Sequence, residues 1–209
     1  MRVLFVDDEP DILDQAKIFL EKKKEELEVE TAASVKKALS LAEEKEYDAV
    51  VSDYQMPEMD GIEFLKEFRE EKNNIPFIIL TGRGDEEIAM RALNIGANQY
   101  IQKTGSPDTQ YGLLVKAIVQ EVKREKLKEE NQQLQTLLEE DLLDELYSLQ
   151  TNLESLQELD LSEEEKKYVD NAINNAQEGI SLITEVSEKR NIIRSLLQKL
   201  KQKVMDKSL

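Results

Sequence analysis

The sequence predicts an α/β fold with a doubly wound five-stranded parallel sheet, followed by an all-α antiparallel helical hairpin or coiled coil. Two observations support this prediction. Short apolar runs alternate with amphipathic helical segments from Arg2 to about Ile118, whereas no strand pattern follows Ser106. We therefore expect two domains, residues 1–122 and residues 123–209, the second being a dimerisation module.

The strand candidates of the first domain are short and mostly apolar. They are residues 2–6 (RVLFV), 27–31 (LEVET), 49–52 (AVVS), 76–80 (PFIIL) and 99–102 (QYIQ). Between them, apolar residues recur at helical spacing, as in Ile12, Ala16, Phe19 and Leu20. Repeated β-α units at short spacing predict parallel strands with helices on both faces of the sheet.

The second domain is predicted to be two long helices. Pro107 and Asp108 start the first helix, residues 159–161 interrupt it, and Ser162 with Glu165 fits a capping box that opens the second. The apolar seam of the first helix is predicted to be Leu134, Leu138, Leu142, Leu146, Leu149, Leu153 and Leu156. The seam of the second is predicted to be Val169, Ala172, Ala176, Ile180, Ile183, Ile193, Leu197, Leu200 and Val204.

Apolar stripes of this length exceed what two helices alone bury well. A second copy of the chain would complete a four-helix bundle, so we expect a homodimer through residues 123–209. Asn131 falls on the seam and is expected to fix the register. The alternative is that the hairpin folds back on its own first domain.

The composition limits the classes of function. The 209 residues include no cysteine and no histidine, which excludes disulfides, thiol nucleophiles and phosphohistidine in this chain. The formal net charge of −17 disfavours binding to nucleic acid or anionic lipid. No stretch approaches the roughly 18 apolar residues of a membrane span, and residues 1–6 run directly into acidic residues, unlike a secretory leader. We expect a cytoplasmic protein without membrane insertion.

Reactive side chains follow the predicted strands. Asp7 and Asp8 follow the first strand, Asp53 the third, Thr81 the fourth and Lys103 the fifth. In a doubly wound sheet these strand ends share one edge. Three carboxylates together need a cation, and Mg²⁺ prefers oxygen ligands, while a lysine and a threonine hydroxyl suit an anion. The set predicts phosphoryl transfer to a side chain.

Four motifs carry a resemblance to a known family. They are VDDEP (6–10), VSDYQMPEMDG (51–61), LTGRG (80–84) and YIQKT (100–104). In order and spacing they are similar to the flavodoxin-like receiver domain of two-component response regulators, which residues 1–122 resemble. The resemblance implies that Asp53 accepts a phosphoryl group from the phosphohistidine of a sensor histidine kinase. It also implies that Asp8 and Asp53, assisted by Asp7 and the backbone carbonyl of Gln55, hold Mg²⁺.

The same resemblance implies a switch. Lys103 would pair with the phosphoryl oxygens, Thr81 would move to hydrogen-bond them, and Tyr100 would swing inward when Thr81 moves.

Two residues depart from the family. Thr104 stands where the family usually has a proline in a cis peptide, so the loop is expected to be either trans or strained. Gly82 stands where the family often has alanine.

A second resemblance concerns the hairpin. Residues 144–156 and 168–186 resemble the dimerisation and phosphotransfer hairpin of sensor kinases. Asp144 stands where that family has its phosphorylated histidine, so Asp144 is a candidate degenerate phosphohistidine position. The resemblance implies a hairpin that is catalytically silent.

We therefore expect a response regulator that passes phosphorylation of Asp53 through its last receiver helix to a dimeric hairpin, which acts on an unknown downstream protein. It would be a phosphoacceptor and not an enzyme, with at most self-phosphotransfer and autodephosphorylation activity. One alternative is a vestigial receiver that acts as a constitutive scaffold. The other is a Mg²⁺-dependent aspartyl-phosphate hydrolase, which Gln55 disfavours because such enzymes usually carry a second acid there.

Overall fold

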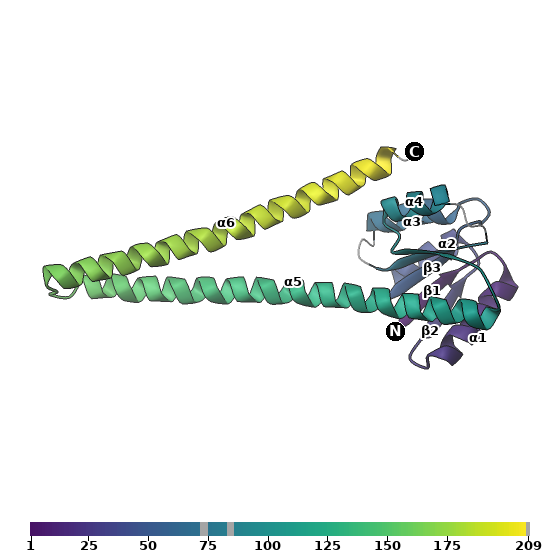
Figure 1. The fold of residues 1–209 in the computed structure, drawn as a ribbon, viewed down its shortest axis with the longest axis horizontal. Coiled ribbons are helices and arrows are strands. Elements are labelled where there is room, and N and C mark those ends of the chain that lie inside the picture. Colours follow the sequence, from purple (N-terminus) through teal and green to yellow (C-terminus); the bar gives the residue numbers. More distant parts are fainter. Residues whose placement is uncertain (72–74, 83–85, 208–209) are drawn as a thin grey trace. The chain divides into compact units, whose positions relative to one another are not determined.

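The computed structural model describes residues 1–71, 75–82 and 86–207, with the side chains of 71, 198 and 201–207 excepted. Five strands and their helices alternate along the chain before two long helices (Figure 1). The elements are β1 (Arg2–Val6), α1 (Pro10–Lys23), β2 (Glu28–Ala32), α2 (Val35–Glu44), β3 (Ala49–Asp53), α3 (Gly61–Glu71), β4 (Phe77–Thr81), α4 (Glu86–Ile95), β5 (Gln99–Gln102), α5 (Pro107–Gln157) and α6 (Glu163–Lys207).

The strands form one parallel sheet in the order β2-β1-β3-β4-β5, which confirms the predicted fold class. The strand positions agree with the prediction to within one residue. Asp53 and Thr81, expected just after their strands, are the last residues of β3 and β4. Because β3 and β4 are buried on both faces, their sequences are continuous apolar runs up to Ser52 in β3 and up to Thr81 in β4.

Two apolar cores cover the two faces of the sheet. Side chains alternate along a strand, so Leu4 and Val6 of β1 belong to one core, and Val3 and Phe5 to the other. Helices α2, α3 and α4 close the first core, and α1 and α5 close the second (Figure 1). This doubly wound arrangement leaves the carboxyl ends of the strands open for a site.

Gly61 allows α3 to start directly against the end of β3. Its backbone N–H donates to the carbonyl oxygen of Tyr54 at 2.9 Å. A Cβ at this position would lie only 2.4 Å from the backbone oxygen of Asp53. A side chain at residue 61 is therefore incompatible with the observed position of the Asp53 backbone.

The chain divides into two compact units. The first contains Met1–Leu127, and the second is Lys128–Gln202. Helix α5 is continuous through both, so the predicted domain boundary at 122/123 lies inside a helix, shortly before the boundary between the units. Within the ranges described above, no helix has an apolar stretch long enough to cross a bilayer.

In the first unit, α5 is held to the sheet by apolar and polar contacts. The ring of Tyr111 stacks on Phe19 of α1 with centroids 5.3 Å apart, and Ile118 is fully buried. Further along, the carboxylate of Glu121 is buried and accepts a hydrogen bond from Gln99 Nε2 at 2.9 Å. Because Gln99 is the first residue of β5, this bond fixes α5 to the strand that precedes it.

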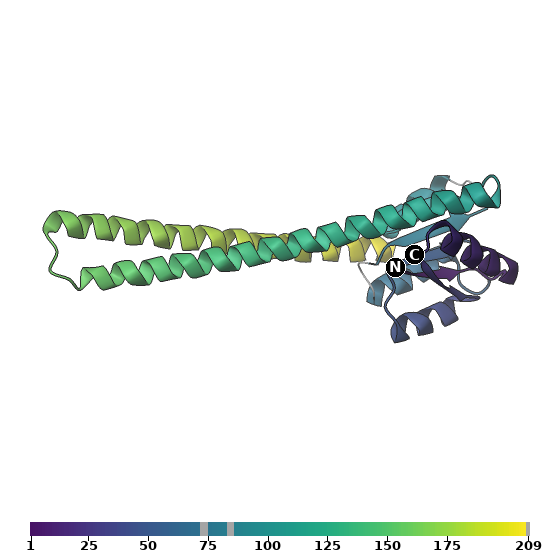
Figure 2. The ribbon, with the colours of Figure 1, turned by 90° about the horizontal axis from the view of Figure 1, so that it is seen from below.

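In the second unit, α5 and α6 form antiparallel arms (Figures 1 and 2). The turn before α6 contains the predicted capping box. Ser162 donates from its backbone nitrogen and from Oγ to Glu165 Oε2, at 2.9 and 2.6 Å, and the Glu165 N–H donates to Ser162 Oγ at 3.4 Å. These bonds satisfy N–H groups that a helix start otherwise leaves unpaired, which fixes where α6 begins.

The arms pack through one narrow seam. Its α5 side chains are half-buried at steps of three and four: Glu139, Leu143, Leu146, Gln150 and Leu153. Its α6 residues are buried or half-buried: Val169, Ala172, Ile173, Ala176, Gly179, Ile180, Ile183, Ser187 and Arg190. A Cβ on Gly179 would lie 3.4 Å from Leu146 Cδ1, so the glycine permits close approach of the helices. The guanidinium of Arg190 pairs with both carboxylate oxygens of Glu139.

The seam predicted for α5 is wrong in part. Leu146 and Leu153 lie in it, but the other predicted leucines are exposed by 41–57%: Leu134, Leu138, Leu142, Leu149 and Leu156. On α6 the prediction holds up to Ile183, whereas Ile193, Leu197 and Leu200 are exposed by 54–58%. Asn131 is exposed as well, and the Val204 side chain lies outside the described residues. Each arm therefore carries two apolar stripes, and the hairpin covers only one of them.

Substituting Gly61→Ala is expected to destabilise the first unit by roughly 1–3 kcal/mol, because the added methyl meets the Asp53 backbone oxygen. The measurement is urea unfolding followed by circular dichroism. Gly82→Ala is the matched control, since a Cβ there has no atom of the other described residues within 4 Å. Equal unfolding midpoints for the two variants would contradict the steric role assigned to Gly61.

Candidate functional site

The reactive centre lies where β1, β3 and β5 end. Asp53 is the last residue of β3, Asp7 follows β1 and Lys103 follows β5. The Lys103 ammonium lies 2.5 Å from Asp53 Oδ1 and 3.0 Å from Asp7 Oδ2. Asp7 and Asp53 are 1% and 6% exposed, so two buried carboxylates share one cation. The structure thus brings together three of the predicted site residues.

Backbone donors hold the remaining carboxylate oxygens. The N–H of Gln55 donates to Asp53 Oδ2 at 2.6 Å, and the N–H of Glu9 donates to Asp7 Oδ1 at 3.0 Å. Each carboxylate is therefore fixed by Lys103 on one oxygen and by the backbone on the other. These donors carry no side-chain signature, so only the structure could reveal them.

Burial and charge shift the protonation equilibria of this centre. Burial raises the pKa of Asp53, and the nearby Asp7 charge acts in the same direction against the opposing effect of Lys103. For Lys103, burial disfavours the ammonium, but hydrogen bonds and charge from Asp53 and Asp7 outweigh it and raise the pKa. Lys103 is therefore a permanent cation beside Asp53 at neutral pH.

Thr81 lies at the same sheet edge. It is 1% exposed, and its backbone oxygen accepts a hydrogen bond from the Lys103 N–H at 2.7 Å. Tyr100, in the neighbouring strand, is half-buried and packs against the core formed with α2, α3 and α4. Their proposed movements on phosphorylation remain predictions.

Asp8 faces a different part of the site. With Tyr54, Gln55 and Pro57 it lines a hollow of about 420 Å³, many times the ~30 Å³ of a water molecule. Among the described residues, no three acidic side chains are gathered so as to hold a metal ion. The expected cluster of three carboxylates around a metal ion therefore stays a prediction, and in this structure the Lys103 ammonium pairs with two of them, Asp7 and Asp53.

The donor set nevertheless fits Mg²⁺. This ion usually keeps several waters and takes one or two protein carboxylates, so it does not need a closed protein cage. Asp8 and the Gln55 backbone line a hollow with room for a hydrated ion, and Asp53 lies two residues before Gln55. That Asp8, Asp53, Asp7 and the Gln55 carbonyl hold the ion stays a prediction.

The loop after Lys103 accommodates the missing proline. All peptide bonds in the described part of the chain are trans, so the Lys103–Thr104 bond is trans. Gly105 has φ +82°, in the left-handed region that glycine adopts readily, and it turns the chain before α5.

One predicted site residue lies outside this centre, and part of one predicted motif is not described. Asp144 belongs to the second compact unit, where it is exposed on α5. Residues 83 and 84 of the LTGRG motif lie outside the described residues.

Replacing Lys103 with methionine is expected to lower the free energy of unfolding by roughly 3 kcal/mol at pH 7, because two buried carboxylates lose their counter-charge. Lys45→Met is the matched control. It removes an exposed pair with Glu30, expected to contribute less than about 1 kcal/mol. Urea unfolding in metal-free buffer measures the free energy of unfolding of both variants. Similar decreases for Lys103→Met and Lys45→Met would refute the structural importance of Lys103.

Comparison with known proteins agrees with this geometry. The response regulator receiver domain family matches residues 3–114. The response regulator SaeR of Staphylococcus aureus is 40% identical over 105 residues, which are 50% of this chain and 45% of SaeR. The chain therefore spans about half the length of the curated relatives it matches.

Solved structures also resemble more than half of this chain. A receiver domain protein from Clostridium thermocellum is 34% identical with a TM-score of 0.54, covering 60% of this chain and 97% of that one. The chemotaxis protein CheY4 of Vibrio cholerae is 31% identical with a TM-score of 0.51, covering 56% and 97%. With the family matched over more than half of its length, this chain belongs to the response regulator receiver domain family.

Proposed function

We propose that this chain is a response regulator that accepts a phosphoryl group on Asp53 from the phosphohistidine of a sensor histidine kinase. Receiver domains of response regulators are phosphorylated by such kinases in two-component signalling. The observation that carries the proposal is Asp53 itself, a buried carboxylate held by Lys103 and the Gln55 N–H at the end of β3. Asp53 is thereby oriented as a nucleophile before any donor binds.

The transfer forms a P–O bond to the Asp53 carboxylate and breaks the P–N bond of the phosphohistidine. The departing imidazole nitrogen takes up a proton, and the product is an acyl phosphate dianion. Lys103 neutralises part of the charge that builds on the phosphoryl oxygens. Mg²⁺, held by Asp8 and Asp53 with the Gln55 carbonyl and with Asp7 assisting, would supply further neutralisation of those oxygens.

Phosphorylation changes the charge balance that holds the centre together. A monoanion paired with Lys103 becomes a dianion with three acceptor oxygens. Thr81, one strand away, is proposed to donate its hydroxyl to the new group, and Tyr100 to move inward after it. This local change in electrostatics would shift the equilibrium between two arrangements of the ends of β4 and β5.

The output is proposed to be a homodimeric hairpin formed by residues 123–209. The support is the exposure of the second leucine stripe on α5, which one hairpin leaves uncovered. Because α5 is fixed to β5 and continues into the hairpin, it is the proposed route of the signal to a downstream protein. The chain would act by protein–protein interaction and not as an enzyme on a separate substrate.

Incubation with Mg²⁺ and acetyl phosphate is expected to add one phosphoryl group to the wild type and none to Asp53→Asn. Intact-mass spectrometry measures the gain. A gain in both proteins would contradict Asp53 as the acceptor. No gain in either would favour the alternative of a vestigial receiver that acts as a constitutive scaffold.

Removal of divalent metal with a chelator is expected to lower the phosphorylated fraction of the wild type at least tenfold, because the phosphoryl oxygens lose a neutralising cation. Asp8→Asn is expected to reproduce this loss even with Mg²⁺ present. Glu9→Gln, an exposed neighbour, is the control and is expected to behave as the wild type. If neither the chelator nor Asp8→Asn lowers the phosphorylated fraction, the proposed metal ligands are wrong.

A further inference from the structure

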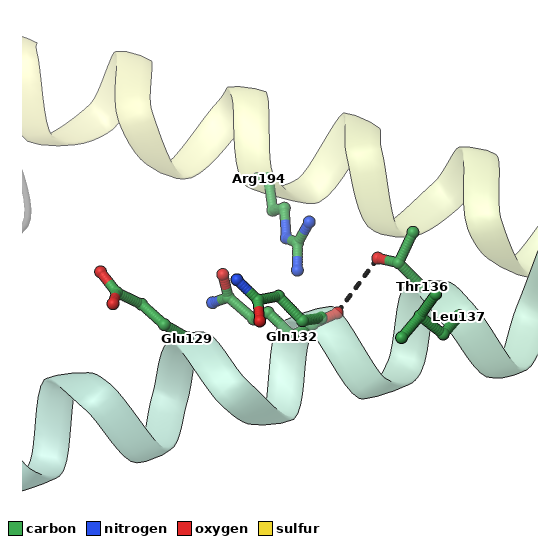
Figure 3. Close-up of a pocket in the computed structure, with 6 residues that line it drawn as sticks. Glu129, Gln132, Thr136, Leu137 and Arg194 are labelled. Atoms are coloured by element: carbon green, nitrogen blue, oxygen red, sulfur yellow. Dashed lines mark hydrogen bonds between the residues drawn. The ribbon is translucent and has the colours of Figure 1, made fainter.

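The groove between the arms of the hairpin is lined by exposed side chains. It has a volume of about 670 Å³, and Arg194 of α6 points there toward the polar side chains of α5 (Figure 3). Because these side chains reach water, contacts among them constrain the helices little. Buried charges that can fix a helix are found instead in the first unit, where Arg69 is 8% and Glu121 is 3% exposed.

Arg69, in the last turn of α3, holds the carboxyl end of α4. Its guanidinium donates from Nε and Nη2 to the carbonyl oxygen of Gly96, at 3.3 and 3.0 Å. It also donates from Nη1 to the carbonyl oxygen of Ile75 at 2.8 Å. Gly96 follows α4 directly with φ +111°, a conformation that often ends a helix. The buried cation thus satisfies a carbonyl group at the helix end, where the helix dipole is negative.

Asn98, between α4 and β5, connects Arg69 with α5. Its side-chain oxygen accepts hydrogen bonds from Arg69 Nη2 at 3.2 Å and from the Phe77 N–H at 2.9 Å. Its side-chain nitrogen donates to Glu121 Oε2 at 3.4 Å, and Gln99 Nε2 donates to Glu121 Oε1 at 2.9 Å. A continuous set of hydrogen bonds therefore runs from α3, past the starts of β4 and β5, to α5.

This network lies at the edge of the sheet opposite the reactive centre. Phe77 and Gln99 are the first residues of β4 and β5, whereas Thr81 ends β4 and Lys103 follows β5. In a sheet of parallel strands, all strands start at one edge and end at the other. Helices α4 and α5 therefore begin on the side of the reactive centre and are held by the network farther along.

Two further ion pairs of α5 in the first unit are more exposed. Lys23 pairs with Asp108 at 2.7 Å, and Lys126 pairs with Asp48 at 2.8 Å. The Asp108 and Lys126 side chains are 77% and 60% exposed, and exposed ion pairs contribute little to stability. The buried contacts of Glu121 are therefore the firmest polar attachment of α5 among these pairs.

We propose that Arg69, Asn98 and Glu121 form a clamp about which α4 and α5 tilt when the reactive centre is phosphorylated. This inference rests on the proposed function and specifies which parts of the first unit move. The clamp resists motion because unpairing a buried charge is costly. Since α5 continues beyond Glu121 as one helix, the same tilt would displace the residues that follow in the opposite direction.

The clamp is tested first without phosphorylation, by amide hydrogen exchange of Arg69→Lys. Lysine keeps the charge but lacks the fork that reaches three acceptors at once. The clamped segments are residues 93–98 and 118–122, and the site segments are residues 86–90 and 107–111. Exchange is expected to become about fivefold faster or more in the clamped segments and to change less than about twofold in the site segments.

Arg2→Lys is the matched control, because it makes the same substitution in an exposed pair with Glu28. It is expected to leave exchange in both kinds of segment unchanged. Glu121→Gln, which removes only the charge at the other end of the clamp, is expected to accelerate the clamped segments as Arg69→Lys does. Uniform acceleration over the whole first unit, or none in the clamped segments, would overturn the clamp.

The tilt is tested on the wild type and on Arg69→Lys, each with Mg²⁺ and acetyl phosphate. In the wild type, phosphorylation is expected to change exchange about threefold or more in the site segments and less than about 1.5-fold in the clamped segments. In Arg69→Lys the change is expected to extend into the clamped segments. If distance from Asp53 alone set the pattern, both proteins would show the same pattern, and the tilt about the clamp would be wrong.

Intact mass of the same samples separates this inference from the proposed function. Without a phosphoryl gain, the proposed function and the tilt both fail, whereas exchange in the unphosphorylated variants still decides whether the clamp exists. A phosphoryl gain with equal changes in the site and clamped segments of the wild type refutes the tilt alone.

Discussion

The first unit depends on a single lysine that neutralises two buried carboxylates. Asp7 and Asp53 come from β1 and β3, and Lys103, which follows β5, reaches both. Without this cation each buried charge would cost several kcal/mol. The sheet must therefore keep the register that brings the ends of these strands together. The same arrangement holds the Asp53 carboxylate in a fixed orientation beside a cation, which the proposed phosphoryl transfer requires. The constraint on folding and the proposed chemistry therefore have one physical origin.

Strand β5 connects this centre with α5. At one end it leads into Lys103, and at the other Gln99 donates to the buried carboxylate of Glu121 on α5. Tyr100 lies between these ends and packs against the core on the other face of the sheet. In the proposed function, a change in charge at Asp53 would act on the strand to which the outgoing helix is fixed, so the described contacts offer a route for the signal.

The sequence predicted the parallel sheet, the two long helices and the residues at the strand ends, because apolar periodicity and strand-end polarity are local signals. It could not reveal that the N–H groups of Glu9 and Gln55 fix the carboxylates, since backbone donors have no side-chain signature. The prediction from sequence also assigned residues of two separate apolar stripes on α5 to a single seam. Leucines spaced by three and four fit two adjacent faces of a helix equally well, and only packing shows that Leu143 faces α6 while Leu142 does not.

The central claim is that Asp53 is the residue that receives the phosphoryl group. Its most direct test is borohydride reduction of the phosphorylated protein, which converts an acyl phosphate of aspartate into homoserine, followed by peptide mass spectrometry. The account predicts homoserine at position 53 and at no other aspartate. Homoserine at Asp7, Asp8 or Asp144 with an unmodified Asp53 would contradict it.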